Sequence, residues 1–225
     1  AIENTLNSIA HHWRQPLSVI STIASGMKLK EEIKELKTKD ILISCDKIIF
    51  NTNKLSKTIE NFSNFFGKDE KISSHSLVES VNNVILFCET IFEKNSIVCK
   101  FKHSEDFIIN CNQINFSDSI LNIIDNSIYA LVNNKDKEDR YILINFSNKI
   151  LSIKDSANGI EEEIITKICE PYFTTKHQSF GVGLGLFTVH EFFVRNLNFK
   201  IEFKNEEFEY KNKKLKGLNI NINFN

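Results

Sequence analysis

Over its first 66 residues, the chain repeats apolar side chains at alternating steps of three and four, the pattern of helices packed along a seam. The first run comprises Leu6, Ile9, Trp13, Leu17, Ile20, Ala24 and Met27. The second comprises Ile41, Cys45, Ile48, Thr52, Leu55, Ile59, Phe62 and Phe66. We expect the Thr52 methyl to pack in the seam and its hydroxyl to bond back to the preceding turn. Because a lone two-helix hairpin buries too little, the pattern predicts a homodimer that forms a four-helix bundle, although a coiled-coil spacer would show the same seam.

Two adjacent histidines stand in the first helix of this hairpin. At about 100° per residue, His11 points almost directly away from the seam, and His12 lies roughly a quarter turn off it. Gln15, four residues further on, shares the outward face of His11. A core histidine would lie in the seam, so His11 is the candidate for a group that reacts with something outside the bundle. A plain spacer would not explain it.

The polar stretch 67–71 marks a linker, and the pattern changes beyond it. We expect helices near 75–93, 113–132, 161–168 and 184–196, and strands near 96–102, 107–110, 141–146, 150–154, 198–206 and 214–224. The strands flanking Ser147-Asn148-Lys149 should form a hairpin. Helices against a mixed or antiparallel sheet predict an α+β fold, a two-layer α/β sandwich. The expected domains are therefore 1–67 and 68–225.

Composition narrows the class of protein. The 28 basic and 29 acidic residues balance, so the chain carries no nucleic-acid footprint. The five cysteines lack metal-ligand spacing, and we expect buried, reduced thiols. With no secretory leader and no run of about 18 apolar residues, we expect a cytoplasmic fragment, cut from a longer chain, that makes no membrane contact itself.

One helix of the second domain could hold a metal ion. Asn122 and Asn126 lie four residues apart on one face, with Asp118 one turn earlier. Amide oxygens are suitable ligands for Mg²⁺, which keeps waters and phosphate oxygens as its other ligands. A solvated polar helix face would show the same pattern.

Two glycine-containing segments could bind a nucleotide. Asp155 ends a predicted strand and could accept a hydrogen bond from an exocyclic amine, while Gly159 allows close backbone approach to a planar ring. A simple turn would look alike. Further on, glycines precede a helix, whose backbone N–H groups could reach phosphate oxygens: Gly181-Val182-Gly183-Leu184-Gly185-Leu186. Neither a dinucleotide fingerprint nor a P-loop surrounds them, and a flexible loop is the alternative. The segment between the two sites, 169–179, could form a lid over a phosphate tail.

Taken in order, these segments resemble the catalytic core of a two-component sensor histidine kinase. Residues 10–17 resemble its phosphoacceptor box in the Trp-Arg-Gln-Pro-Leu variety, and residues 122–126 its N box. Residues 155–159, 170–176 and 181–186 resemble the first glycine box, the F box and the second glycine box.

The resemblance implies a Bergerat-type ATP-binding domain fused to a dimeric helical hairpin. It further implies that Mg-ATP phosphorylates His11 and that an aspartate of a response regulator then receives the phosphoryl group. Asn126 and Asn122 would hold Mg²⁺, and Asp155 would bind the adenine amine. The remaining nucleotide-binding residues would be Gly159, Phe173, Thr175, Lys176, Gly181, Gly183, Leu184, Gly185 and Leu186. Gln15 could orient a water for regulator phosphatase activity.

Three positions depart from the family pattern. His12 replaces the usual proton-accepting neighbour of the phosphoacceptor, so we expect a slower or more pH-sensitive kinase step. Ala157 replaces the central glycine of the first glycine box, and Tyr129 stands where many members carry Lys, Arg or Asp. A non-phosphorylating ATPase of the same superfamily, a degenerate-kinase dimerisation scaffold, and phosphorylation at His12 are the alternatives.

Overall fold

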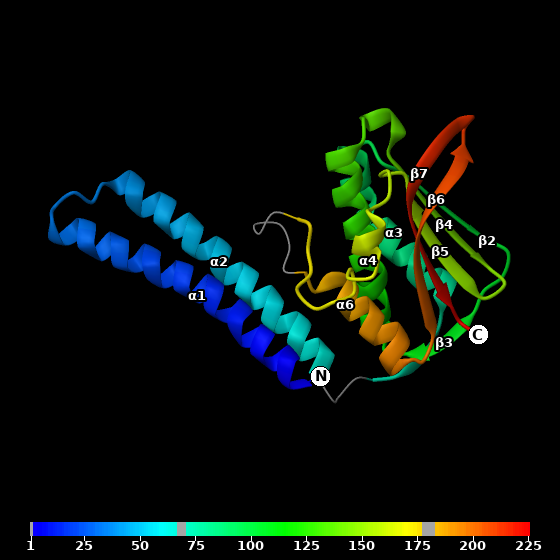
Figure 1. The fold of residues 1–225 in the computed structure, drawn as a ribbon, viewed down its shortest axis with the longest axis horizontal. Coiled ribbons are helices and arrows are strands. Elements are labelled where there is room, and N and C mark those ends of the chain that lie inside the picture. The colour runs from blue at the N-terminus through cyan, green and yellow to red at the C-terminus, as the bar shows by residue number, and fades with distance from the viewer. Residues whose placement is uncertain (1, 67–70, 177–182) are drawn as a thin grey trace. The chain divides into compact units, whose positions relative to one another are not determined.

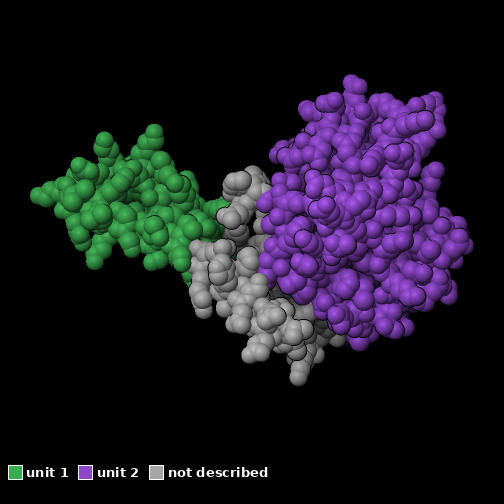
Figure 2. All heavy atoms as spheres, viewed as in Figure 1, with its two compact units in different colours: residues 1–68 green, residues 69–225 purple. Residues whose placement is uncertain are grey.

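The computed structural model describes residues 2–66, 71–176 and 183–225, except for the side chains of residues 2–15, 54 and 57–66. The chain forms two compact units, residues 1–68 and residues 69–225 (Figure 2). Within the described residues, no helix is both long and apolar enough to cross a membrane.

The first unit is the expected helical hairpin. Helix α1 spans Ile2–Glu32 and helix α2 spans Thr38–Phe66. An ion pair of 3.1 Å joins Lys30 Nζ to Asp40 Oδ1 across the turn, and the Asp40 carboxylate also accepts a hydrogen bond from the backbone N–H of Lys37. The Thr52 hydroxyl donates to the carbonyl oxygen of Ile48 at 2.9 Å, which is the expected bond back to the preceding turn, although Thr52 itself is exposed.

Part of the predicted seam is exposed in the single chain. On α1 the least exposed described residues are Pro16, Ile20, Ile23 and Met27. Leu17 and Ala24, both expected in the seam, are exposed. On α2, Ile41, Cys45 and Thr52 are exposed too. The stripe that the single neighbouring helix covers is displaced by about one residue from the predicted seam, since Ser44 and Asn51 of α2 are less exposed than Cys45 and Thr52. The physical reason is that heptad spacing fixes the repeat of the apolar side chains but not which flank of them faces a single neighbour.

The second unit is the predicted α+β domain. Its helices are α3 (Leu77–Lys94), α4 (Gln113–Asn134), the short α5 (Glu162–Ile165) and α6 (Gly185–His190), with a 3₁₀ turn at Lys137–Asp139. Its strands are β1 (Ser73–Ser76), β2 (Val98–His103), β3 (Ile108–Cys111), β4 (Tyr141–Ser147), β5 (Ile150–Asp155), β6 (Lys200–Tyr210) and β7 (Lys213–Asn223).

Five of these strands form a mixed sheet in the order β2-β4-β5-β7-β6, and β1 pairs with β3 separately. Only β2 and β4 run parallel; the other neighbours in the five-stranded sheet are antiparallel. Helices α3, α4 and α6 cover one face of this sheet (Figure 1). Between the two layers lies a core of aliphatic and phenylalanine side chains, in which Phe116, Phe146 and Phe193 are fully buried.

The differences from the expected elements are local. The predicted hairpin forms through Asn148 and Lys149, which both adopt positive φ as a tight β-turn requires. The helix expected over 184–196 is α-helical only to His190 and continues as a π-helical turn over Glu191–Asn196. All five cysteines are free thiols; Cys88 and Cys111 are buried, whereas Cys45 is exposed and not buried as expected.

Candidate functional site

The carboxylate of Asp155 lies where β5 ends, and it is almost completely buried. Its Oδ1 accepts hydrogen bonds from the backbone N–H groups of Ala157 (2.9 Å) and Leu218 (3.3 Å). Its Oδ2 accepts one from the hydroxyl of Ser127 on α4 at 3.3 Å. Residues from the β5 end, β7 and α4 therefore fix the orientation of this one acidic group.

Burial raises the pKa of Asp155 from 3.8 to about 6, because the charged form loses water. The hydrogen bonds from Ala157, Leu218 and Ser127 act in the opposite direction and limit the rise. The group is therefore ionised at neutral pH and offers a buried acceptor, which is the chemistry required to bind an exocyclic amine.

Gly217 on β7 makes the position of this carboxylate possible. A Cβ at Gly217 would overlap the backbone carbonyl of Asp155 and would approach its Oδ1 within 2.8 Å. No side chain fits between the two segments, so strand β7 can approach the carboxylate only through a glycine.

A second close approach shapes the loop after Asp155. Gly159 adopts a φ of +74°, and a Cβ there would overlap the side chain of Asn205. The amide of Asn205 accepts a hydrogen bond from the N–H of Ile160 (2.9 Å) and donates to the carbonyl of Ile160 (2.7 Å). It also donates to Glu162 Oε1 at 2.9 Å. The side chain of Asn205 thus bonds both backbone groups of Ile160, as an adjacent strand would, and fixes the loop that follows Asp155.

Two expected metal-site residues lie together beside α6. A Cβ at Gly185, the first residue of α6, would lie 3.7 Å from both Asn122 Oδ1 and Asn126 Nδ2, an ordinary van der Waals distance. The side chain of Asn122 also donates to the Thr188 hydroxyl at 3.4 Å. The side chains of Asn122 and Asn126 on α4 therefore lie against the first residues of α6.

Lys176 reaches the same place from the segment before α6. Its Nζ donates to Asn126 Oδ1 at 2.7 Å and lies 4.6 Å from the centroid of the Tyr129 ring. Desolvation lowers the pKa of this ammonium group, and the nearby charge of Asp125 opposes that change. The amide oxygen of Asn126 is therefore the acceptor of a positively charged group in this structure.

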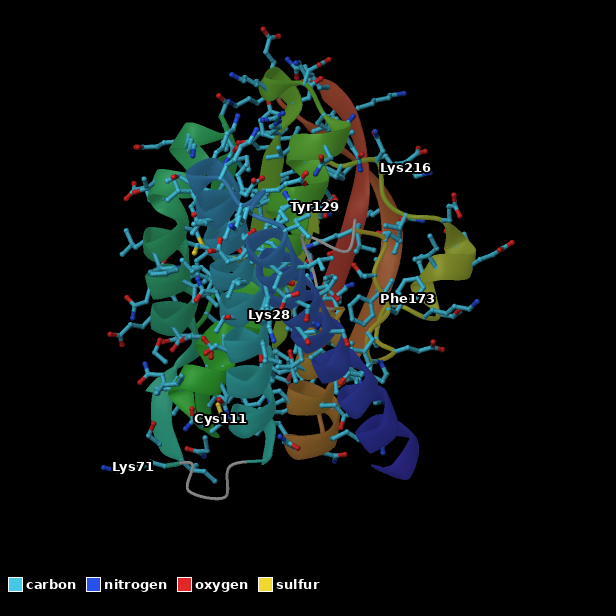
Figure 3. All side chains as sticks on the ribbon, turned by 90° about the vertical axis from the view of Figure 1, so that its left-hand side faces the viewer. Lys28, Lys71, Cys111, Tyr129, Phe173 and Lys216 are labelled. Atoms are coloured by element: carbon cyan, nitrogen blue, oxygen red, sulfur yellow. The ribbon has the colours of Figure 1, made fainter. Side chains whose placement is uncertain are left out.

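The other described glycine-box and F-box residues lie between α5 and α6 or in the first residues of α6. Gly183 adopts a φ of +73°, and its carbonyl accepts a hydrogen bond from the N–H of Tyr172 at 2.8 Å. Phe173 is half-buried on the segment between α5 and α6 (Figure 3), and Thr175 is exposed. Leu184 directly precedes α6, and Leu186 packs against the core.

Four expected site residues lie, wholly or with their side chains, outside the described part of the structure. His11, His12 and Gln15 lie within the backbone of α1, but their side chains are outside the described residues, and so is the whole of Gly181. Pro16 lies inside the helix and has no amide hydrogen, so α1 lacks the usual bond to the carbonyl of residue 12.

Three residues of the site were missed in the sequence: Ser127, Asn205 and Gly217. Ser127 and Asn205 carried no signal, since an ordinary hydroxyl or amide acts here through distant partners. Gly217 did carry one, because an isolated glycine within a strand pattern indicates a bulge or a close backbone approach.

The described residues fit a nucleotide with its metal ion. A buried anionic acceptor lies at one end of the site, and two amide side chains with a lysine lie at the other. When bound, Mg²⁺ would neutralise phosphate charge, with Asn126 and Asn122 as its protein ligands.

We expect Asp155→Asn to stabilise the nucleotide-free chain and to abolish adenine-nucleotide binding. Because the folded-state pKa is raised to about 6, the folded chain binds this proton more tightly, and its stability rises as pH falls from about 7 to 4. The neutral amide removes the cost of burying the charge, about 1–3 kcal/mol at pH 7.5. Urea unfolding at several pH values and ADP titration measure both effects. The exposed Asp136→Asn is the control; an Asp155→Asn chain that binds ADP normally contradicts the assignment.

We expect Gly217→Ala to lower the free energy of unfolding by about 2–4 kcal/mol and to abolish nucleotide binding, because the new methyl group overlaps the Asp155 backbone. The matched control is Gly26→Ala in α1, where a Cβ meets nothing within 4 Å. That change should stabilise the helix by about 0.5–1 kcal/mol and leave nucleotide affinity unchanged. Equal nucleotide affinity in the two variants would contradict the role assigned to Gly217.

Comparison with known proteins points to one family. Residues 112–222 match the family described as "Histidine kinase-, DNA gyrase B-, and HSP90-like ATPase". Sporulation kinase C of Bacillus subtilis (strain 168) is 27% identical over 184 residues, which are 78% of this chain and 40% of that protein. The chain thus spans well under half of the length of this relative.

Solved structures agree in fold. The histidine kinase ThkA, in complex with the response regulator protein TrrA, matches with a TM-score of 0.63 and 20% identity, over 97% of this chain and 60% of that one. Full-length ShkA in complex with AMPPNP matches with a TM-score of 0.64 and 14% identity, over 97% and 45%. Residues 112–222 therefore match the histidine kinase-, DNA gyrase B- and HSP90-like ATPase family, within a chain that resembles sensor histidine kinases in sequence and in fold.

Proposed function

We propose that the chain is the core of a protein-histidine kinase, which binds Mg-ATP in its second unit and phosphorylates His11. The observation that carries this proposal is the buried carboxylate of Asp155, held at a strand end by two backbone N–H groups and Ser127. Support comes from the ATPase family match over residues 112–222 and from the AMPPNP bound to the structural neighbour ShkA.

The proposed reaction transfers one phosphoryl group. A ring nitrogen of His11 attacks the γ-phosphorus of ATP, the bond to the β-phosphate oxygen breaks, and ADP leaves. The proton on the other ring nitrogen of His11 passes to a base, and His12 in its neutral form is the neighbour in the sequence that can accept it. An aspartate of a response regulator then takes the phosphoryl group from His11. The regulator bound to the neighbour ThkA supports this last step.

The binding residues would contact the nucleotide at two ends of the site, the base at one end and the phosphates at the other. Asp155 would accept from the adenine amine, and Gly159 would leave room for the ring. Asn126, Asn122 and Lys176 would face the phosphates. Gly181, Gly183 and Gly185 would shape the segment around them, together with Phe173, Thr175, Leu184 and Leu186.

We further propose that two copies of the hairpin form a four-helix bundle. A stripe of α2 at steps of four and three remains exposed in the single chain, and it includes Leu42, Cys45 and Ile49. Leu17 and Ala24 of α1 are exposed as well. Cys45, Leu17 and Ala24 belong to the predicted seam, and Leu42 and Ile49 lie next to seam positions; a second copy would bury all five.

In light scattering, the wild-type chain of 26.0 kDa should have the mass of a dimer. The double variant Leu42→Glu/Ile49→Glu should be monomeric at micromolar concentration, because it places charges in the apolar interface. Leu86→Glu, at an exposed leucine of α3 in the second unit, should leave the dimer intact. A wild-type monomer would refute the bundle.

Incubation with radiolabelled ATP should label the wild-type chain with phosphate that is labile in acid and stable in alkali, as phosphohistidine is. His11→Gln should abolish the label, and His12→Gln should keep it with a changed pH profile of the rate. If His11→Gln retains the label and His12→Gln loses it, His12 is the acceptor. Nucleotide binding with no label in any chain indicates an ATPase or a scaffold.

Gln15 is proposed to orient a water for hydrolysis of the regulator's acyl phosphate, since it shares the outward face of His11. Gln15→Ala should lower the rate of regulator dephosphorylation at least tenfold and leave labelling of His11 within about twofold. Dephosphorylation of a phosphorylated regulator at the wild-type rate would refute this role.

A further inference from the structure

One contact in the candidate site has no counterpart in the function proposed so far. The ammonium group of Lys176 donates to Asn126 Oδ1 at 2.7 Å, although this oxygen is the proposed ligand of a metal ion. The same ammonium lies 4.6 Å from the centroid of the Tyr129 ring (Figure 3 labels Tyr129 on α4). Lys176 thus contacts two residues that lie three apart on α4, and the charge of Asp125 on the same helix also acts on it.

A metal ion bound to the amide oxygen of Asn126 would lie close to the ammonium group of Lys176. A magnesium ion binds an oxygen ligand at about 2.0–2.1 Å, so a metal on Asn126 Oδ1 would lie no more than about 5 Å from Lys176 Nζ in its present position. Two positive charges at that separation, in a half-buried site, repel each other strongly. Lys176 in its present position therefore opposes the binding of a metal ion to Asn126.

Tyr129 contributes to holding Lys176 beside Asn126, together with the charge of Asp125. An ammonium group over the face of a tyrosine ring is attracted by the ring's electron density, and the attraction grows as water is excluded. The backbone around Tyr129 is held within α4, where its carbonyl accepts a hydrogen bond from the side chain of Asn133 at 2.7 Å. The ring is thus presented at a fixed place beside the amide of Asn126.

We propose that Tyr129 is a positioning residue, which holds Lys176 in a resting contact with Asn126 that a divalent cation must displace. The proposal rests on the proposed function. A nucleotide without metal need not break this contact, because an ammonium group has three donors and can bond a phosphate oxygen while it stays on Asn126. The contact therefore weakens metal-dependent nucleotide binding specifically.

The test compares the Kd for ADP in excess EDTA with the Kd in saturating MgCl₂ at matched ionic strength, using the full chain. Tyr129→Leu removes the aromatic face and should tighten binding in MgCl₂. The Kd in EDTA divided by the Kd in MgCl₂ should therefore rise about three- to tenfold. Tyr129→Phe keeps the face and should leave the ratio within twofold of wild type. Thermal unfolding of each variant checks that the domain remains folded.

A double-mutant cycle shows whether Tyr129 acts through Lys176. In a Lys176→Met chain, Tyr129→Leu should no longer change the ratio, because the displaced cation is gone. The proposal is overturned if Tyr129→Leu leaves the ratio unchanged, if Tyr129→Phe matches Tyr129→Leu, or if the effect persists without Lys176. Wild-type chain that binds ADP in neither solution overturns the proposed function itself.

Discussion

The candidate site of the second unit depends on keeping one carboxylate charged while it is buried, although the charge itself costs folding stability. Asp155 can stay ionised at neutral pH only because donors converge on it from its own loop, from β7 and from α4. Strand β7 must therefore lie directly beside β5, although β7 is the last strand of the chain. Glycines at 217 and 159 allow this arrangement, because each lets the backbone approach a neighbouring segment where a side chain would not fit.

The two ends of the site differ in charge. The Asp155 end presents a buried acceptor for an uncharged amine, whereas the Asn126 end presents amide oxygens and a lysine. An adenine nucleotide has the matching polarity, with a neutral base and a highly charged phosphate tail. The difference in charge between the two ends, rather than any single glycine motif, is what makes the site suitable for an adenine nucleotide. Lys176 already satisfies Asn126, so the phosphate end also has a resting arrangement of its own.

Much of this could be predicted, because the relevant patterns are local. The amide pair of α4, the strand end at Asp155 and the hairpin at Asn148 and Lys149 each depend on neighbours in the sequence. Ser127 and Asn205 could not be predicted, because each acts on a residue far away in the chain. The predicted helical seam differs from the stripe that one hairpin covers, because Leu17 and Ala24 are exposed while Pro16 and Ile23 are not, and heptad spacing does not say which flank of the stripe faces which helix.

The close fit of Gly217 against Asp155 makes strand register a condition of ligand recognition. Successive side chains of a strand point to opposite faces, so a slip of β7 by one residue would exchange every contact along it. Such a slip would bring Lys216 or Leu218 against the Asp155 backbone, where only a glycine fits. A ligand that requires the intact carboxylate would bind only correctly paired sheets and would stabilise those alone. Nucleotide in the surrounding solution would therefore also select the correctly folded form of the chain.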